Sequence, residues 1–215
     1  MFAWNDETWG IAANVNGQSL TLPEIGHGFM TGSTIATPNG WRFVEALSVG
    51  DEVMTFDGGA QRIVDIRRHY IYTHESHDQI EYWPIHVPTG ALSNLKDMML
   101  LPNQAVMIES DAAEEVYGDP FALVPAASLE GLRKIARVKP SPRVEVISLS
   151  CARDQILFTN GNTLCLCRKS RDMMDELFGR DQSYRILPMD QAELLVDLME
   201  IDDGLIASGQ GHLRA

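Results

Sequence analysis

Positive charge and cysteine are both scarce in this sequence. The chain has 17 Lys and Arg residues against 30 Asp and Glu, which gives a formal net charge of -13 at pH 7. Nucleic-acid phosphates and anionic lipid surfaces repel a protein of this charge, so we expect neither as a partner. The cysteines, Cys151, Cys165 and Cys167, are odd in number and lie late in the chain, which argues against a paired disulfide framework and favours a reducing, cytoplasmic location.

Long apolar runs are also missing. No apolar stretch approaches the length of a membrane span, and the N-terminus has neither the basic region nor the apolar segment of a secretory signal. We therefore expect no membrane partner and a cytoplasmic protein, with export by a non-cleaved route left open. Hydrophobic residues make up 45% of the chain and charged residues 22%, which is ordinary for a folded globular protein.

Short apolar runs alternate with turn signals through the middle of the chain, and this pattern predicts a mainly β domain. The apolar runs at 98–101 and 121–124 are expected to fill its core. The expected strands are 34–36, 51–55, 61–69, 79–86, 105–108, 143–149, 155–159 and 163–167.

Changes in composition and hydrophobic pattern along the sequence divide it into three segments. Residues 1–25 form a polar lead-in, which we expect to add an edge strand at 19–22. Residues 26–168 form the β domain. Residues 169–215 form an acidic helical C-terminal extension with helical spacing at 173–178 and 190–199, through which we expect an unknown protein partner to bind.

One stretch carries a specific resemblance. GSTIATPNGWRFVEALSVGDEVMT, at 32–55, resembles the first block of the Hint domain, the module shared by hedgehog autoprocessing domains and inteins, in its bacterial stand-alone variety. Segments 86–111 and 144–167 resemble later blocks of the same family. The resemblance implies a compact Hint-type β fold of many short strands with a short helical C-terminal tail. The matched positions of the first block are Val44, Glu45, Leu47, Gly50, Asp51, Val53 and Thr55.

The resemblance also implies a self-cleaving chemistry that this chain lacks. It requires a thiol or hydroxyl nucleophile at the start of the domain and a His that protonates or polarises the scissile amide. The nucleophile position falls on Gly28, which has no side chain, and the His position falls on Gln104, whose amide does not exchange a proton near neutral pH. A His of the late block falls near Asp154. We therefore expect a degenerate Hint-domain protein that does not cleave itself and acts as a binding or regulatory module.

Two alternatives stay open. The first is autoproteolysis or a splicing-type reaction that uses another nucleophile, such as Ser33 or Thr34, which follow Gly28 closely in sequence. Such a hydroxyl would need a base nearby in space, and His27 is the nearest His along the chain. The second is a β protein that binds a small molecule in an enclosed apolar pocket.

We predict no metal and no cofactor. His74 and His77 are spaced three apart but lack a third ligand, so a solvated loop is the simpler interpretation. Cys165 and Cys167 would point to the same side of a strand, and we expect buried thiols there. The acidic run 109–115 lacks the oxygen spacing of a calcium loop, and we expect a solvated loop.

Overall fold

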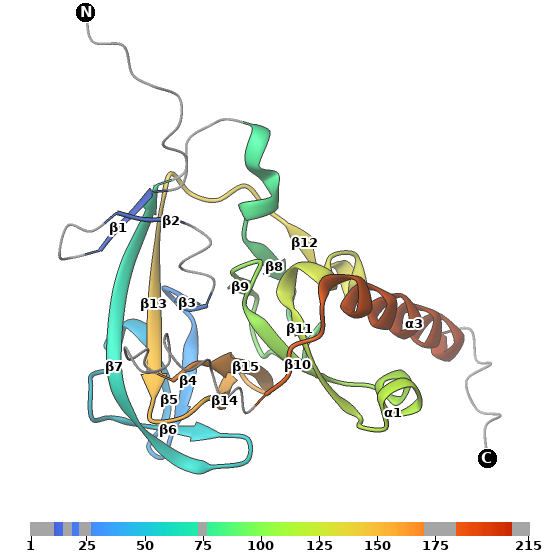
Figure 1. Ribbon diagram of the computed structural model, residues 1–215, viewed down its shortest axis with the longest axis horizontal. Coiled ribbons are helices and arrows are strands. Elements are labelled where there is room, and N and C mark those ends of the chain that lie inside the picture. The colour runs from blue at the N-terminus through green and yellow to red at the C-terminus, as the bar shows by residue number, and fades with distance from the viewer. Residues whose placement is uncertain (1–10, 15–18, 22–26, 73–76, 170–183, 208–215) are drawn as a thin grey trace, which may run out of the picture.

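The computed structural model describes residues 11–14, 19–21, 27–72, 77–169 and 184–207, and its strands form one highly curled sheet (Figure 1). The strands are β1 Ile11–Asn14, β2 Ser19–Thr21, β3 Phe29–Met30, β4 Thr34–Thr37, β5 Gly40–Phe43, β6 Glu52–Thr55, β7 Gly59–Tyr72, β8 Ile85–Val87, β9 Met98–Leu100, β10 Ala105–Glu109, β11 Phe121–Pro125, β12 Ala136–Arg137, β13 Arg143–Cys151, β14 Gln155–Thr159 and β15 Thr163–Cys167. The helices are α1 Asp111–Tyr117 and α3 Met189–Ala207, with 3-10 turns η2 Val44–Ala46, η3 His77–Tyr82, η4 Ala126–Leu129 and η5 Leu132–Lys134.

Two long antiparallel strands, β7 and β13, form the spine of the sheet (Figure 1). From β7 the sheet continues through β6, β14, β15 and β10 to β11, and from β13 it continues through β3, β9 and β8 to β12. The expected edge strand of the lead-in is confirmed, because β2 pairs with β1 and β1 pairs with the end of β7. This topology brings the start of the domain at β3 against the middle of β13.

The core explains why the alternating segments became strands. Successive strand residues point to opposite faces, so alternation places one set of side chains inside. Ile35, Val53 and Ile63 are at most 1% exposed, and the expected core runs at 98–101 and 121–124 lie largely within β9 and β11. The mainly β fold class predicted from the sequence is confirmed.

The C-terminal helix is also confirmed, and it is longer than the predicted 190–199. One side of α3 buries Ala192, Leu195, Val196 and Met199, and the helix packs against η4, η5 and β11. The chain reaches α3 along β11, where the Leu187 amide donates a 2.8 Å hydrogen bond to the Leu123 carbonyl. The second predicted helix, 173–178, lies outside the described residues. No described helix is long and apolar enough to cross a membrane.

Two sequence predictions about local structure are wrong. The predicted strand at 79–86 is the 3-10 turn η3 followed by Pro84, and strand β8 begins only at Ile85, because Pro84 has no amide hydrogen to donate to a ladder. The acidic run at 109–115 is not a solvated loop. Ser110 caps α1 by accepting a hydrogen bond from the Ala112 amide, and Ala112 and Ala113 are buried.

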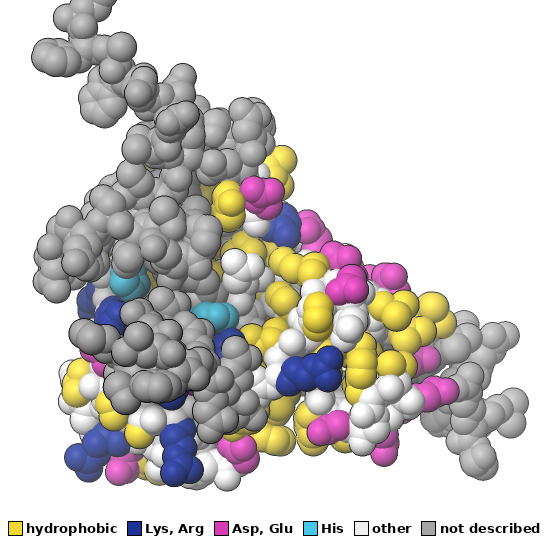
Figure 2. Space-filling model, viewed as in Figure 1, with side chains coloured by type: hydrophobic (Ala, Val, Ile, Leu, Met, Phe, Trp, Pro, Cys, Tyr) yellow, Lys and Arg dark blue, Asp and Glu magenta, His cyan; other side chains and the backbone are white. Residues whose placement is uncertain are grey.

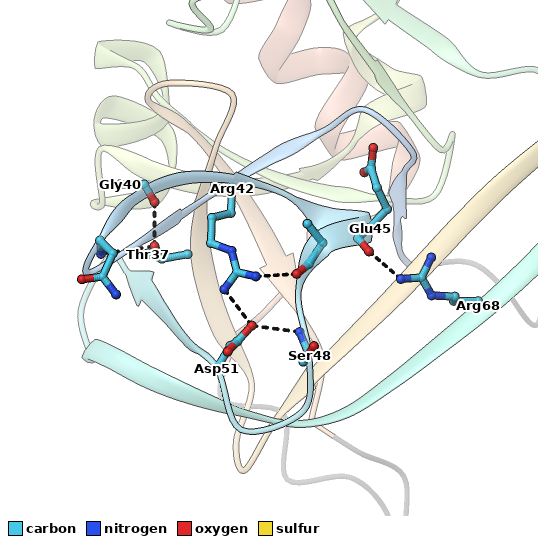
Figure 3. Close-up of polar contacts among 9 residues, drawn as sticks. Thr37, Gly40, Arg42, Glu45, Ser48, Asp51 and Arg68 are labelled. Carbon is cyan, nitrogen blue, oxygen red and sulfur yellow. Dashed lines mark hydrogen bonds and ion pairs between the residues drawn. The ribbon is translucent and has the colours of Figure 1, made fainter.

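A polar network holds the loop that carries the sequence motif of 44–55 (Figure 3). The Asp51 carboxylate accepts hydrogen bonds from Arg42 Nη1 at 2.8 Å and from the Ser48 amide at 2.9 Å. Arg68 Nη2 donates to the Glu45 carbonyl at 2.6 Å, which ties η2 to the spine strand β7. The Glu45 carboxylate accepts from the Gly32 amide at 3.1 Å. Glu45 and Asp51 therefore have structural roles, fixing the loops on either side of η2.

Candidate functional site

The two positions at which the resemblance places chemistry meet in space. The Gly28 amide donates a 3.0 Å hydrogen bond to Gln104 Oε1, and both residues are buried. Gln104 lies directly before β10, and its Nε2 donates to the carbonyls of Leu166 at 2.9 Å and Ala105 at 3.2 Å. These two bonds fix the side-chain amide with its oxygen towards Gly28. Gln104 thus accepts a hydrogen bond from the Gly28 amide and has no acidic proton to donate to its nitrogen.

A third residue, Ser148 of β13, completes the contact with this peptide bond. Its hydroxyl donates a 3.0 Å hydrogen bond to the His27 carbonyl. The peptide bond between His27 and Gly28 is therefore held at both ends, the N–H by Gln104 and the C=O by Ser148. Sequence analysis missed Ser148, because its place depends on the β13–β3 register, in which Ile147 pairs with Phe29.

The space that a nucleophilic side chain would occupy is filled. A Cβ atom built on Gly28 would lie 2.6 Å from Val146 Cγ1 and 3.1 Å from Ser148 Oγ, and the first distance is shorter than real Cβ contacts allow. Val146 is fully buried and β-branched, so its side chain has little freedom to rotate away. A side chain at position 28 therefore requires Val146 or the strand that carries it to shift.

Of the two hydroxyls proposed from the sequence as substitutes, that of Thr34 is bound elsewhere, and Ser33 is held by backbone hydrogen bonds. The Thr34 hydroxyl and the Thr34 amide both donate to Asn160 Oδ1, at 3.0 Å and 2.7 Å. Ser33 is buried in the turn before β4, where its amide donates to the Met30 carbonyl and its carbonyl accepts from the Val44 amide. The Thr34 hydroxyl thus bonds to a neutral amide oxygen, which is not a base that could activate it.

Asp154 makes its hydrogen bonds at the end of β15. Its carboxylate accepts from the Lys169 amide at 2.8 Å and from Arg168 Nη1 at 3.4 Å. The site is therefore built from Gly28, Gln104 and Ser148, and Asp154 holds the chain where it leaves the β domain.

His69 of β7 is the titratable residue that the strand register places beside this site. It pairs with Val146 across the spine, so the two side chains share one face of the sheet. His69 is 5% exposed, and its Nδ1 has no hydrogen-bond partner among the described residues. Burial, together with the nearby charge of Arg67, lowers the pKa of His69 below its usual value. The imidazole is therefore neutral near pH 7.

The three cysteines are buried thiols, as expected for Cys165 and Cys167. Burial raises the pKa of Cys165 to about 12. A hydrogen bond between Cys151 and Cys167 raises the pKa of Cys167, which is also fully buried, and lowers that of Cys151. A thiol with a strongly raised pKa is a poor nucleophile at neutral pH, so Cys165 and Cys167 are unreactive as placed.

The candidate metal ligands from the sequence do not form a metal site in the described part of the chain. Within it, no group of three or more His, Cys, Asp or Glu side chains is arranged to hold a metal ion. His74 lies outside the described residues, and only the backbone of His77 is described, at the start of η3.

Comparison with known proteins identifies what the chain is similar to. A family model described as "Hint domain" matches residues 27–164. A bacterial intein-like domain from Clostridium thermocellum is 12% identical with a TM-score of 0.45, over 66% of this chain and 99% of that chain. The gp41-1 intein is 10% identical with a TM-score of 0.39, over 66% of this chain and 98% of that chain. Among curated proteins, no match was found.

Proposed function

The chain belongs to the Hint domain family, and we propose that it is a non-cleaving member, a binding or regulatory module that keeps the peptide bond between His27 and Gly28 intact. The observation that carries the proposal is the absence of room for a nucleophile. A Cβ at Gly28 meets Val146 at 2.6 Å, so the attacking side chain that this chemistry needs is both missing and sterically excluded.

The proton transfers of cleavage are also unsupported. Breaking the bond requires a donor that protonates the Gly28 nitrogen as it leaves. Gln104 Oε1 instead accepts from that nitrogen, and its Nε2 hydrogens are bound by two backbone carbonyls. An amide side chain does not titrate in the range where proteins fold. The contacts of Gln104 thus stabilise the unbroken bond.

Self-cleavage by a hydroxyl is the second candidate, and the contact of Ser148 is the one observation that favours it. Ser148 Oγ lies 3.0 Å from the His27 carbonyl oxygen, but it does so as a donor to that oxygen. In that role it polarises the carbonyl and leaves its own proton in place. Attack would need a base bonded to Ser148, but the strand register pairs Ser148 with Arg67 and the buried His69 with Val146.

Trapping tests the proposal. We expect the purified full-length chain to keep one intact mass during incubation with hydroxylamine or with a small thiol, because no ester or thioester forms at His27. A fragment ending at His27 would overturn the proposal, and its loss in Ser148→Ala, Ser33→Ala or Thr34→Val would identify the nucleophile. Hydroxylamine also cuts Asn–Gly bonds, so fragments ending at Asn16, Asn39 or Asn160 do not count.

We further propose that the C-terminal extension, residues 169–215, is the part of the molecule that engages a protein partner. Its charge supports this, because α3 carries six Asp or Glu residues and no Lys or Arg.

The odd number of cysteines supports a cytoplasmic location for the protein.

A further inference from the structure

Helix α3 has a partly exposed apolar ridge next to the side that packs on the core. Leu194 is 56% exposed and Ile201 is 59% exposed, and between them lies the half-buried Leu198, which also packs against the hydrophobic core. Positions i, i+4 and i+7 lie along one side of a helix, so these three residues form a ridge. The helix therefore packs one side on η4, η5 and β11 and exposes Leu194 and Ile201 to solvent.

Helix α1 packs beside α3 and has exposed apolar side chains of its own. Val116 is 50% exposed and Tyr117 39% exposed, and Met189 at the start of α3 is 39% exposed. We call these residues, with the ridge of Leu194, Leu198 and Ile201, the α1–α3 surface. Figure 2 shows yellow apolar and magenta acidic side chains gathered at the α3 end of the molecule. Contiguous apolar surface rimmed by charge is typical of protein interaction sites.

The charge of the two helices indicates which kind of partner the α1–α3 surface binds. Helix α1 contains three Asp or Glu residues and α3 contains six, nine in all, and neither helix contains Lys or Arg. Asp203 is paired with Arg133, while the exposed Asp190, Glu193 and Asp197 flank the ridge. A second copy of the chain would bring the same nine acids against each other, since a twofold interface places identical patches together. Like charges make that occupant unfavourable.

We propose that the α1–α3 surface binds a basic amphipathic helix of a partner protein. Its apolar side chains pack on Leu194, Leu198 and Ile201, and its Lys or Arg side chains face Asp190 and Asp197. Laying an amphipathic helix along a hydrophobic surface is a common mode of peptide recognition. This inference rests on the proposed non-catalytic binding role and gives that role a surface and a class of partner.

A designed peptide tests the inference by calorimetric titration of the full-length chain. The probe is a 14-residue peptide of Leu and Lys with Leu at helical spacing, and its control has the same composition with Leu and Lys strictly alternating. We expect the helical probe to bind at least tenfold more tightly than the control, and to weaken as salt is raised, because charge pairing is screened.

Variants locate the binding surface. We expect Leu194→Gln combined with Ile201→Gln to weaken binding of the helical probe by tenfold or more, and Leu95→Gln, at a leucine that is 71% exposed in the loop before β9, to leave it unchanged. Circular dichroism checks that each variant is folded. Equal affinity of the wild type and the double variant, or equal binding of the two peptides, would overturn the inference.

Two further measurements separate this inference from other outcomes. A dimer of the wild type in size-exclusion chromatography that the double variant loses would assign the α1–α3 surface to a second copy and overturn the inference. Self-cleavage at His27 would overturn the proposed function alone, because α1 and α3 both follow Gly28 in the chain and the titration would still report on them.

Discussion

At Gly28 the backbone passes so close to β13 that even a methyl group collides with Val146. We predict that Gly28→Ala lowers the free energy of unfolding by about 1–3 kcal/mol, the usual cost of overpacking a core. Urea unfolding measures this change. Gly204→Ala is the matched control, because nothing lies within 4 Å of the Cβ built on Gly204 in α3. We expect that control to be neutral or stabilising, since Ala is the better helix former.

A double variant tests the cause of the Gly28→Ala effect. If the collision is with Val146, then Gly28→Ala combined with Val146→Ala costs less than the sum of the two single changes. Additive costs would mean that the strain at Gly28 arises elsewhere.

Gln104 is expected to be critical for stability, because it satisfies three buried backbone groups. Gln104→Leu leaves the Gly28 amide and the carbonyls of Ala105 and Leu166 without this partner. We predict a loss of about 3 kcal/mol or more in the free energy of unfolding, given roughly 1–3 kcal/mol for each buried group left unsatisfied. Gln61→Leu is the control, since Gln61 makes one exposed bond to the Gly58 carbonyl. Equal losses in the two variants would contradict this role.

His69 is expected to make stability depend on pH. Its pKa in the folded protein lies below the unfolded value of about 6.5, so the folded state resists protonation. The stability of the wild type is therefore fully present above pH 6.5 and decreases as the pH falls below that value. We predict that His69→Leu removes this part of the pH dependence, measured as the difference in unfolding free energy between the two proteins from pH 8 to pH 5. A constant difference would show that His69 does not titrate on unfolding.

At the scale of elements, the end of α3 is anchored by one bidentate ion pair. Arg133 Nε and Nη2 donate to the two carboxylate oxygens of Asp203, at 2.7 Å and 2.9 Å. The hydrogen bond from Arg133 lowers the pKa of Asp203 below 3.8, so the ion pair contributes above that pH and is lost as the pH falls below the folded value. The pair is partly exposed, and we expect less than about 1 kcal/mol from it.

Hydrogen exchange tests this anchor. We predict that Asp203→Asn speeds amide exchange in the last turn of α3 at pH 7, because the helix end then opens more often. The neighbouring, exposed Asp202→Asn is the matched control and should leave the exchange rates unchanged. Equal acceleration in both variants would mean that charge in general, and not the pair with Arg133, sets the stability of this turn.

Short apolar runs bounded by turn signals were predictable as strands from the sequence, and short elements fixed by tertiary contacts were not. Strands β10, β14 and β15 are continuous apolar runs of this kind, and β6 alternates buried residues with more exposed ones. Helix α1 was missed because it spans only seven residues and its buried residues, Ala112 and Ala113, are both small. Its boundary signals were present in Ser110, the N-cap, and Gly118, which adopts a left-handed φ of 75° at the C-cap. A search for caps would have found it.

At the scale of the whole molecule, the motif of 44–55 predicted the family and the fold through its resemblance to the first Hint block, and in the structure Glu45 and Asp51 of this motif fix the loops on either side of η2. The sequence did not establish whether Gly28, Gln104 and Asp154 converge in space; in the structure Gly28 and Gln104 meet, and Asp154 makes its hydrogen bonds at the end of β15. Ser148, Val146 and His69 could not be placed from the sequence, since their positions beside Gly28 depend on the pairing of β13 with β3 and β7. Long-range register is set by the packed sheet, and no local pattern records it.

The central claim is that the peptide bond between His27 and Gly28 stays intact, and a digest measures this bond directly. Arg42 is the first Lys or Arg in the chain, so trypsin releases the whole segment 1–42 from the uncut protein. After long incubation of the folded protein between pH 6 and pH 9, followed by digestion and mass spectrometry, we predict that 1–42 is the only peptide that ends at Arg42. Accumulation with time of a peptide that begins at Gly28 and ends at Arg42 would contradict the account.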